Sequence, residues 1–255
     1  MTDAALPLTS HLRELRSRIF KMLIAWLVGT LAAWSWRELI FSHLLAPATH
    51  ALGEGAKLQA IAPTEIFFTY MECALLAGFL LALPVVFWQA WAFVAPGLYP
   101  NEKRVALPFV LISTSLFVTG AWFGHTVVFP VIFNFFASFN SDFVAAAWTM
   151  EEVFDFSTRM LLGFGVGFEL PVVVYFLAYA GIVSPRKMLA GTKYFVLIAF
   201  IVGGVLTPPD PLSQSLLAGP MIGLYLLGVG AAYLFVPKRE GSAEAGSSLP
   251  TLLKR

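Results

Sequence analysis

Charged side chains are scarce in this sequence, and cysteine is almost absent. Only 12% of the 255 residues are Asp, Glu, Lys or Arg, whereas soluble domains contain about 25%. The single cysteine, Cys73, excludes an internal disulfide and a thiolate cluster. The four histidines have neither HxxxH nor HExxH spacing, and no GxxxxGKS or GxxxxGKT phosphate loop is present. We therefore expect no metal site, no cofactor and no nucleotide hydrolysis.

Apolar residues, in contrast, are abundant. They make up 58% of the chain, and the mean hydropathy is +0.79. A water-soluble fold of this length cannot bury so much apolar surface, so lipid must solvate most of it. The sequence therefore predicts an all-α polytopic membrane protein with six transmembrane helices, because a spanning helix needs about 20 mostly apolar residues. The predicted helices lie within residues 22–36, 73–94, 105–129, 160–184, 194–206 and 212–236.

Two boundaries follow from this segmentation. Residues 1–236 are expected to form a single six-span domain, and residues 237–255 a disordered cytoplasmic tail rich in Gly and Ser. Pro130 is expected to end the third helix near Phe129. The segment that follows, residues 131–152, is expected to form an amphipathic cap at the membrane interface. The side chains that predict the cap are Phe133, Phe135, Phe136 and Phe139.

The Lys and Arg residues are distributed unevenly between the predicted loops. Thirteen of the 16 lie in the N-terminal segment, in the loops after the second and fourth helices, and in the tail. Only Arg37 and Lys57 lie in the opposite loops. Because positive charge favours the cytoplasmic side, we expect both termini in the cytoplasm. This orientation argues against a cleaved signal peptide in the first run, and the net charge of +1 gives no indication of a nucleic-acid partner.

The fifth predicted helix is short. It runs only from Tyr194 to Leu206, because Pro208 and Pro209 end it. Its length of roughly 20 Å compares with about 30 Å of hydrocarbon in a bilayer. Either neighbouring helices shield it, or the membrane is thinned beside it. The second alternative suits a protein that moves large cargo.

Glu169 lies near the middle of the fourth predicted helix. A charge at that depth costs about 2.5 kcal/mol or more, so such residues usually face a cavity or a partner. The alternative is a protonated glutamic acid that is hydrogen-bonded to a neighbouring helix. Pro171, two residues further on, is expected to kink the helix at this point.

Glu14, Glu102 and Gln89 have plainer interpretations when each is considered alone. Arg18 follows Glu14 by four residues, so the two predict a surface ion pair worth about 0.3–0.5 kcal/mol. Glu102 stands directly before Lys103 and has the character of a solvated loop acid. Gln89 lies near the end of the second helix and is expected to bond to another helix. None of these patterns indicates a binding site by itself.

Six motifs nevertheless follow one another in an order that resembles the TatC family of twin-arginine protein translocase subunits. No single motif is specific, but the ordered set is. The motifs are SHLRELR at 10–16, GFLLALP at 78–84, WAFVAPGLYPNEKR at 91–104, FELP at 168–171, SPRKMLAGTKYF at 184–195 and TPPDPLSQ at 207–214.

This resemblance implies a concave helical receptor that is not an enzyme. The TatC family takes part in the export of folded proteins that carry an Arg-Arg signal peptide, driven by the proton-motive force. The family's acids that match Glu14 and Glu102 recognise the arginine pair. A carboxylate binds the planar guanidinium fork through two oxygens, whereas lysine presents only a point charge. The positions that match Arg16, Phe93 and Pro47 are implicated near signal binding or coupling.

The resemblance also implies partners and a location. The family's single-span subunits TatA and TatB dock at a polar patch that matches Thr207 and Gln214. Glu169 is expected to contact a partner of this kind rather than the signal peptide. Pro209 and Asp210 match a periplasmic loop motif. Membrane lipids and further copies of the chain are the other expected partners, and the cytoplasmic (inner) membrane is the expected location.

Two other functions were open from the residues alone. The first is a secondary transporter of small solutes, with Glu169 as its proton-coupled site. The second is an intramembrane hydrolase, which needs a nucleophile and a base within the membrane. Ser113 and Ser115 are candidate nucleophiles, but the sequence shows no histidine partner for them in the bilayer core.

Overall fold

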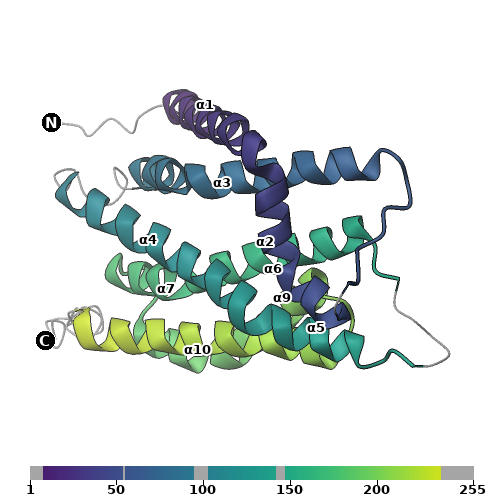
Figure 1. Ribbon diagram of the computed structural model, residues 1–255. Coiled ribbons are helices and arrows are strands. Elements are labelled where there is room, and N and C mark those ends of the chain that lie inside the picture. Colours follow the sequence, from purple (N-terminus) through teal and green to yellow (C-terminus); the bar gives the residue numbers. More distant parts are fainter. Residues whose placement is uncertain (1–7, 54, 95–102, 142–146, 237–255) are drawn as a thin grey trace, which may run out of the picture.

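The computed structural model describes residues 8–53, 55–94, 103–141 and 147–236, and these are helical throughout apart from short connections (Figure 1). Glu102 and the predicted disordered tail, residues 237–255, lie outside the described residues. The helices, in chain order, are α1 (Leu8–Ala33), η1 (Trp34–Trp36), α2 (Arg37–Leu52), α3 (Glu65–Val94), α4 (Lys103–Phe123), η3 (Gly124–Val128), α5 (Phe129–Ala137), α6 (Met150–Phe168), α7 (Leu170–Tyr179), α8 (Pro185–Ala190), α9 (Thr192–Leu206) and α10 (Pro211–Phe235).

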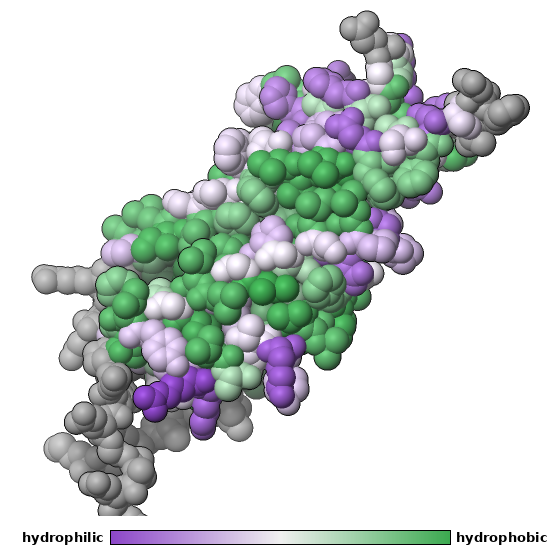
Figure 2. Space-filling view, turned by 90° about the horizontal axis from the view of Figure 1, so that it is seen from below, coloured by the Kyte–Doolittle hydropathy of each residue, from purple (hydrophilic) through white to green (hydrophobic). Residues whose placement is uncertain are grey.

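Within the described residues, these helices join into five rods that are long and apolar enough to cross a membrane, together with one shorter apolar helix. The short one is α9, with 15 residues, so the prediction of a short fifth helix is confirmed. Apolar side chains cover broad areas of the surface (Figure 2), as expected for a protein that lipid solvates. The five rods are His11–Leu52, Glu65–Phe93, Leu107–Ala137, Met150–Tyr179 and Pro211–Phe235.

The rods are longer than the uncharged runs that predict them. The second begins at Glu65 rather than Cys73, and the first continues through η1 into α2. The third does not end before Pro130, as the sequence predicts, but continues to Ala137 after the π-helical turn of η3. Pro130 lies in the first turn of α5, where the missing N–H has no intrahelical partner to lose.

The predicted interruption near Pro171 is confirmed. α6 ends at Phe168 and α7 begins at Leu170, so Glu169 occupies the junction. Pro171 stands in the first turn of α7 and cannot donate the backbone hydrogen bond that would continue α6. The sequence thus places a carboxylate at the one break in this rod.

Two helix pairs pack at unusually short range. A Cβ added to Gly78 of α3 would lie 2.4 Å from the Thr30 nitrogen of α1, and one added to Gly29 would lie 2.6 Å from the Gly78 carbonyl oxygen. Glycine at both positions therefore lets the two backbones touch. The Trp26 indole N–H also donates to the Leu75 carbonyl at 2.8 Å, which fixes α1 against α3. Between α4 and α6, a Cβ on Gly120 would similarly lie 2.5 Å from the Phe164 carbonyl oxygen.

The helix ends fall into two groups. The start of α1, the end of α3, the start of α4 and the end of α10 lie together, and we call this the α1 end (Figure 1). The opposite end, where α2, α5 and the starts of α3 and α6 meet, is the α5 end. Its core is built from α2, α3, α5 and α6, and includes Leu45, Phe129, Ile132 and Phe154.

One buried carboxylate joins two segments at the α5 end by hydrogen bonds. Glu65, at the start of α3, accepts hydrogen bonds from the backbone N–H groups of Ile61 at 2.6 Å, Ala62 at 3.2 Å and Glu151 at 3.1 Å. The connection before α3 and the start of α6 are thus joined through a single side chain. The backbone bond from Met150 to the Gln59 carbonyl, at 2.8 Å, reinforces the link.

The predicted phenylalanine cap is partly wrong. Phe139 is 67% exposed, as a cap requires, but Phe133 is only 3% exposed. Phe133 packs against Phe129 and Phe156 inside the core. The segment therefore begins as α5, a core helix, because its phenylalanines do not all lie on one helix face.

Candidate functional site

The α1 end brings three predicted polar residues together. Arg18 donates from Nε to Glu14 Oε1 at 3.0 Å, and its Nη2 forms an ion pair with the same oxygen. This confirms the predicted i,i+4 pair. Arg18 Nη1 also donates to Gln89 Oε1 of α3 at 3.5 Å, which confirms that Gln89 bonds to another helix. Glu14 is therefore held where the first turns of α1 meet the last turns of α3.

Phe93 belongs to the same cluster, whereas Arg16 faces away from it. The Phe93 ring, one turn beyond Gln89 on α3, stacks on the His11 imidazole with the ring centroids 4.5 Å apart and 20° between the planes. Arg16 is exposed on α1, and residues two apart on a helix do not share a face with Glu14. An aromatic ring pair and a carboxylate thus lie at the same contact between the two helices.

The other two predicted signal-binding residues are Glu102 and Pro47. Glu102 lies outside the described residues, although it immediately precedes Lys103, where α4 begins at the α1 end. Pro47 lies inside α2, between the buried residues Leu45 and Ala48. The part of α1 that follows Glu14 ends at Ala33 and spans about 29 Å. Pro47 therefore lies far from Glu14, at the α5 end (Figure 1).

The Glu169 carboxyl group lies inside the bundle and does not use all of its hydrogen-bonding capacity. Ser113 and the backbone at Phe117, both of α4, are close enough to influence its carboxyl group. Among the described residues, however, neither Glu169 Oε1 nor the fully buried Ser113 Oγ makes a hydrogen bond that meets normal geometry. The buried indole N–H of Trp91, on α3, also lacks a partner there. The predicted bond to a neighbouring helix is therefore not formed at Oε1.

The hairpin between α9 and α10 positions the last set of predicted residues. Asp210 caps α10, with Oδ1 accepting from the Ser213 N–H at 2.8 Å, and Pro209 is exposed just before it. The buried Thr207 hydroxyl donates to the Gly203 carbonyl at 2.9 Å. Gln214 Nε2 donates to the Phe200 carbonyl at 2.6 Å and so holds α10 against α9. These polar groups are already used to shape the hairpin.

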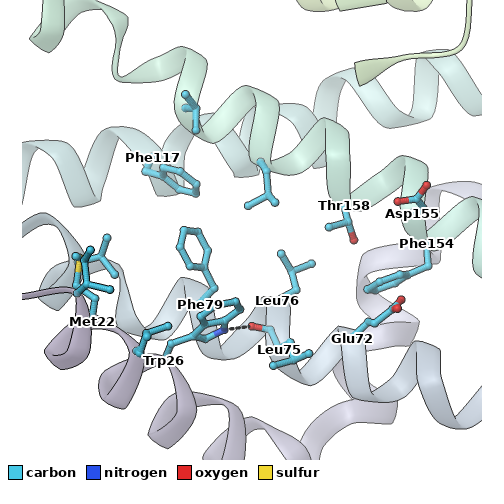
Figure 3. A pocket seen from close by; sticks show the side chains of 15 residues that line it. Met22, Trp26, Glu72, Leu75, Leu76, Phe79, Phe117, Phe154, Asp155 and Thr158 are labelled. Carbon is cyan, nitrogen blue, oxygen red and sulfur yellow. Dashed lines mark hydrogen bonds between the residues drawn. The ribbon is translucent and has the colours of Figure 1, made fainter. Parts of the chain in front are cut away.

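An open hollow of about 720 Å³ between α1, α3, α4 and α6 was not predicted from the sequence. Its walls are apolar, with Trp26, Phe79 and Phe117 among the lining residues (Figure 3). Glu72 of α3 and Asp155 of α6 lie near each other at one end of it. The only available sequence signal was a carboxylate at the edge of each of two apolar runs.

The arrangement is that of a binding protein. The described residues contain no group of three or more His, Cys, Asp or Glu side chains that could hold a metal ion. The polar features are instead a paired carboxylate at one end, an unsatisfied acid in the interior and a short helix with an exposed apolar face. These features suit recognition of cationic and helical ligands rather than bond-breaking chemistry.

The comparisons with known proteins agree with this arrangement. Residues 10–220 match the model of the family described as TatC, Sec-independent protein translocase protein. The TatC protein of Desulforapulum autotrophicum is 42% identical over 238 residues, which cover 93% of this chain and 88% of that protein. The TatC protein of Helicobacter pylori is 39% identical over 230 residues, which cover 90% of this chain and 88% of that protein.

A solved structure extends the match to the fold. The crystal structure of the twin-arginine translocase receptor TatC superposes with a TM-score of 0.79 at 34% identity, covering 88% of this chain and 98% of that chain. The chain is thus a multi-pass membrane protein of protein transport and not an enzyme, which excludes the hydrolase alternative and leaves the solute transporter without support. It belongs to the TatC family, the receptor subunits of the twin-arginine translocase.

Proposed function

We propose that this receptor binds the Arg-Arg signal peptides of folded cargo proteins through Glu14 and Glu102. The proposal depends on one observation above all: Glu14 already holds a guanidinium, that of Arg18, at the α1 end. Glu102 directly precedes α4, which begins at this same end (Figure 1). Two guanidinium groups need two acids on one surface, because each fork binds one carboxylate bidentately.

Phe93 and Arg16 complete the proposed site. The Phe93 ring, stacked on His11, offers an apolar and aromatic wall beside Glu14. Such a ring packs against the aliphatic stem or the planar head of an incoming arginine. The exposed Arg16 lies on α1 but faces away from Glu14, so it can pair with an acidic group of the leader or cargo outside the Glu14 cluster. Pro47, at the α5 end, acts in coupling to other subunits rather than in leader recognition.

The single-span subunits TatA and TatB are the second proposed class of partner. A stripe of apolar side chains on α9 is more than half exposed: Tyr194, Leu197, Ile201 and Val205. Their spacing of three and four residues places them on one helix face, which suits a second apolar helix. Thr207, Gln214, Pro209 and Asp210 shape the end of this face, and Glu169 offers an acceptor that is unsatisfied among the described residues.

The orientation belongs to the same proposal. The chain lies in the cytoplasmic (inner) membrane. Its α1 end, and therefore both termini, face the cytoplasm, where the receptor binds leaders before export. Thirteen of the 16 cationic residues fall in segments assigned to that side. Several copies of the chain assemble with TatA and TatB, and the proton-motive force drives export.

The leader site is tested by binding. The full chain in lipid nanodiscs is titrated with a labelled leader peptide that carries Arg-Arg and with its Lys-Lys twin. We expect Glu14→Gln and Glu102→Gln each to weaken Arg-Arg binding at least tenfold while the melting temperature changes little. Glu38→Gln, which removes an exposed acid of α2, is the matched control. Unchanged binding in both acid variants would reject the site.

The orientation is tested by labelling. Single cysteines replace the exposed residues Ser17, at the α1 end, and Ala56, before α3, in a Cys73→Ala background. A membrane-impermeant maleimide should label Ala56→Cys in intact cells and Ser17→Cys only after lysis. The opposite pattern would overturn the proposed orientation, whereas the binding test above would be unaffected.

A further inference from the structure

The acid proposed to read the leader is already occupied by a guanidinium from its own helix. Arg18 directs Nε and Nη2 to Glu14 Oε1 and Nη1 to Gln89 Oε1. The Arg18 side chain is 18% exposed and that of Glu14 is 39% exposed. The internal guanidinium is therefore the more sheltered member of the pair, and it lies between α1 and α3.

The two guanidinium groups compete for the same acceptor. A carboxylate accepts a guanidinium fork through both of its oxygens, and Arg18 already uses Oε1 with two of its N–H groups. A leader arginine can bind bidentately only after Arg18 has left that oxygen. The displacement is easy, because an i,i+4 pair at a partly exposed position changes an equilibrium by only about two- to fivefold.

We infer that Arg18 is an internal placeholder, which occupies Glu14 in the leader-free receptor and sets the affinity threshold that any leader must exceed. This inference rests on the proposed role of Glu14 in leader binding. A leader arginine has to displace this group to bind bidentately, so the placeholder weakens binding of an Arg-Arg leader.

A purely structural role for Arg18 makes the opposite prediction. If Arg18 only orients the Glu14 carboxylate, its removal leaves the acid mobile and weakens leader binding. If it occupies the acid, its removal tightens binding. The sign of the change separates the two roles.

The experiment measures dissociation constants of the full chain in nanodiscs for the Arg-Arg peptide and its Lys-Lys twin. Arg18→Gln should bind the Arg-Arg peptide about two- to fivefold more tightly. Arg13→Gln is the matched control, since it removes the same charge from an exposed residue of α1 for which the described residues show no contact with Glu14. Its effect should be smaller. Unchanged or weaker binding by Arg18→Gln would overturn the inference.

Two further variants keep the result interpretable. Arg18→Lys retains the charge but loses the fork, so it should give a smaller tightening, and it replaces Arg18→Gln if that variant does not fold. In a Glu14→Gln background, Arg18→Gln should have no effect on leader binding. If Glu14→Gln alone leaves leader binding intact, the proposed function fails. If it abolishes binding but Arg18→Gln weakens it, only the placeholder role fails.

Discussion

The α5 end and the α1 end of the bundle use carboxylates in different ways. At the α5 end, Glu65 is only 7% exposed and accepts from three backbone N–H groups. At the α1 end, Glu14 is partly exposed and paired with one side chain from its own helix. The first carboxylate holds elements together and the second can exchange its partner. A receptor needs both, because a rigid frame keeps an exchangeable site in place.

The packing of the α5 core also differs from that of α1. The core around Phe129, Ile132 and Phe154 joins α2, α3, α5 and α6 at the α5 end. Along α1, by contrast, Phe20, Leu27 and Leu31 are 63%, 59% and 76% exposed. Lipid or partner chains, rather than the bundle itself, must cover that face. The α5 core is thus buried within the bundle, whereas α1 keeps an apolar face that the bundle does not cover.

The largest expected effect comes from removing the carboxylate that joins the elements at the α5 end. Glu65→Ala leaves three backbone donors without their acceptor, and bonds to a charged group are the strong ones. We expect the melting temperature in detergent to fall by roughly 5–10 °C. Glu38→Gln, at an exposed acid of the neighbouring α2, should change it by less than about 1 °C. Equal effects of the two variants would remove the contrast between the ends.

The next largest effect tests whether α1 depends on its contact with α3. Gly78→Ala would place a methyl group 2.4 Å from the Thr30 nitrogen, so the helices must separate, at a cost of about 1–3 kcal/mol. Because Glu14 and Gln89 lie on these two helices, leader binding should weaken as well. Gly219→Ala, which meets no atom within 4 Å, should be neutral or slightly stabilising. Thermal unfolding measures the change in stability, and peptide titration measures the change in leader binding. If Gly78→Ala changed neither, the contact between α1 and α3 would not be needed.

A smaller effect is expected in the α9–α10 hairpin. Gln214→Leu removes the bond from Nε2 to the Phe200 carbonyl, which is worth about 1 kcal/mol. The α9 face should lose its fixed angle to α10, so co-purification with the single-span subunits should fall more than stability does. Ser215→Ala, at an exposed neighbour, is the control. A loss of stability without a loss of partner binding would contradict the proposed docking face.

The smallest effect is expected for the ion pair beside the hollow. Arg159 and Asp155 form an i,i+4 pair at 2.7 Å, and both side chains are 54% exposed. Such pairs contribute about 0.3–0.5 kcal/mol. Arg159→Gln should therefore leave the melting temperature within about 2 °C of the parent chain. A larger fall would show that the hollow's rim is as rigid as the Glu65 junction.

Local patterns predicted local structure well. The four-residue spacing of Glu14 and Arg18 predicted their ion pair, and Pro171 predicted the break at Glu169. Both follow from helix geometry within one turn. The same local reasoning was wrong for Pro130, because a proline that ends one helix also begins another without loss.

Features that join distant segments were beyond the sequence pattern. Phe133 was expected at the interface but lies in the core, because Phe129 and Phe156 pack around it. The hollow with Glu72 and Asp155 was not predicted, since its residues come from four helices. The Glu65 carboxylate accepts from the Glu151 N–H, and no periodicity encodes this contact between the start of α3 and the start of α6.

The sequence by itself determined that this chain is a helical membrane protein and that one of its apolar helices is short. It also determined the family to which the chain belongs. Hydropathy and helix-breaking residues act locally along the chain, so the amino-acid sequence alone reveals them. Only the tertiary structure decided that Arg18 bridges Glu14 and Gln89, that Pro47 lies away from the proposed leader site and that one Glu169 oxygen has no hydrogen-bond partner among the described residues. These depend on how helices cross, and crossing is set by side-chain packing between segments far apart in the chain.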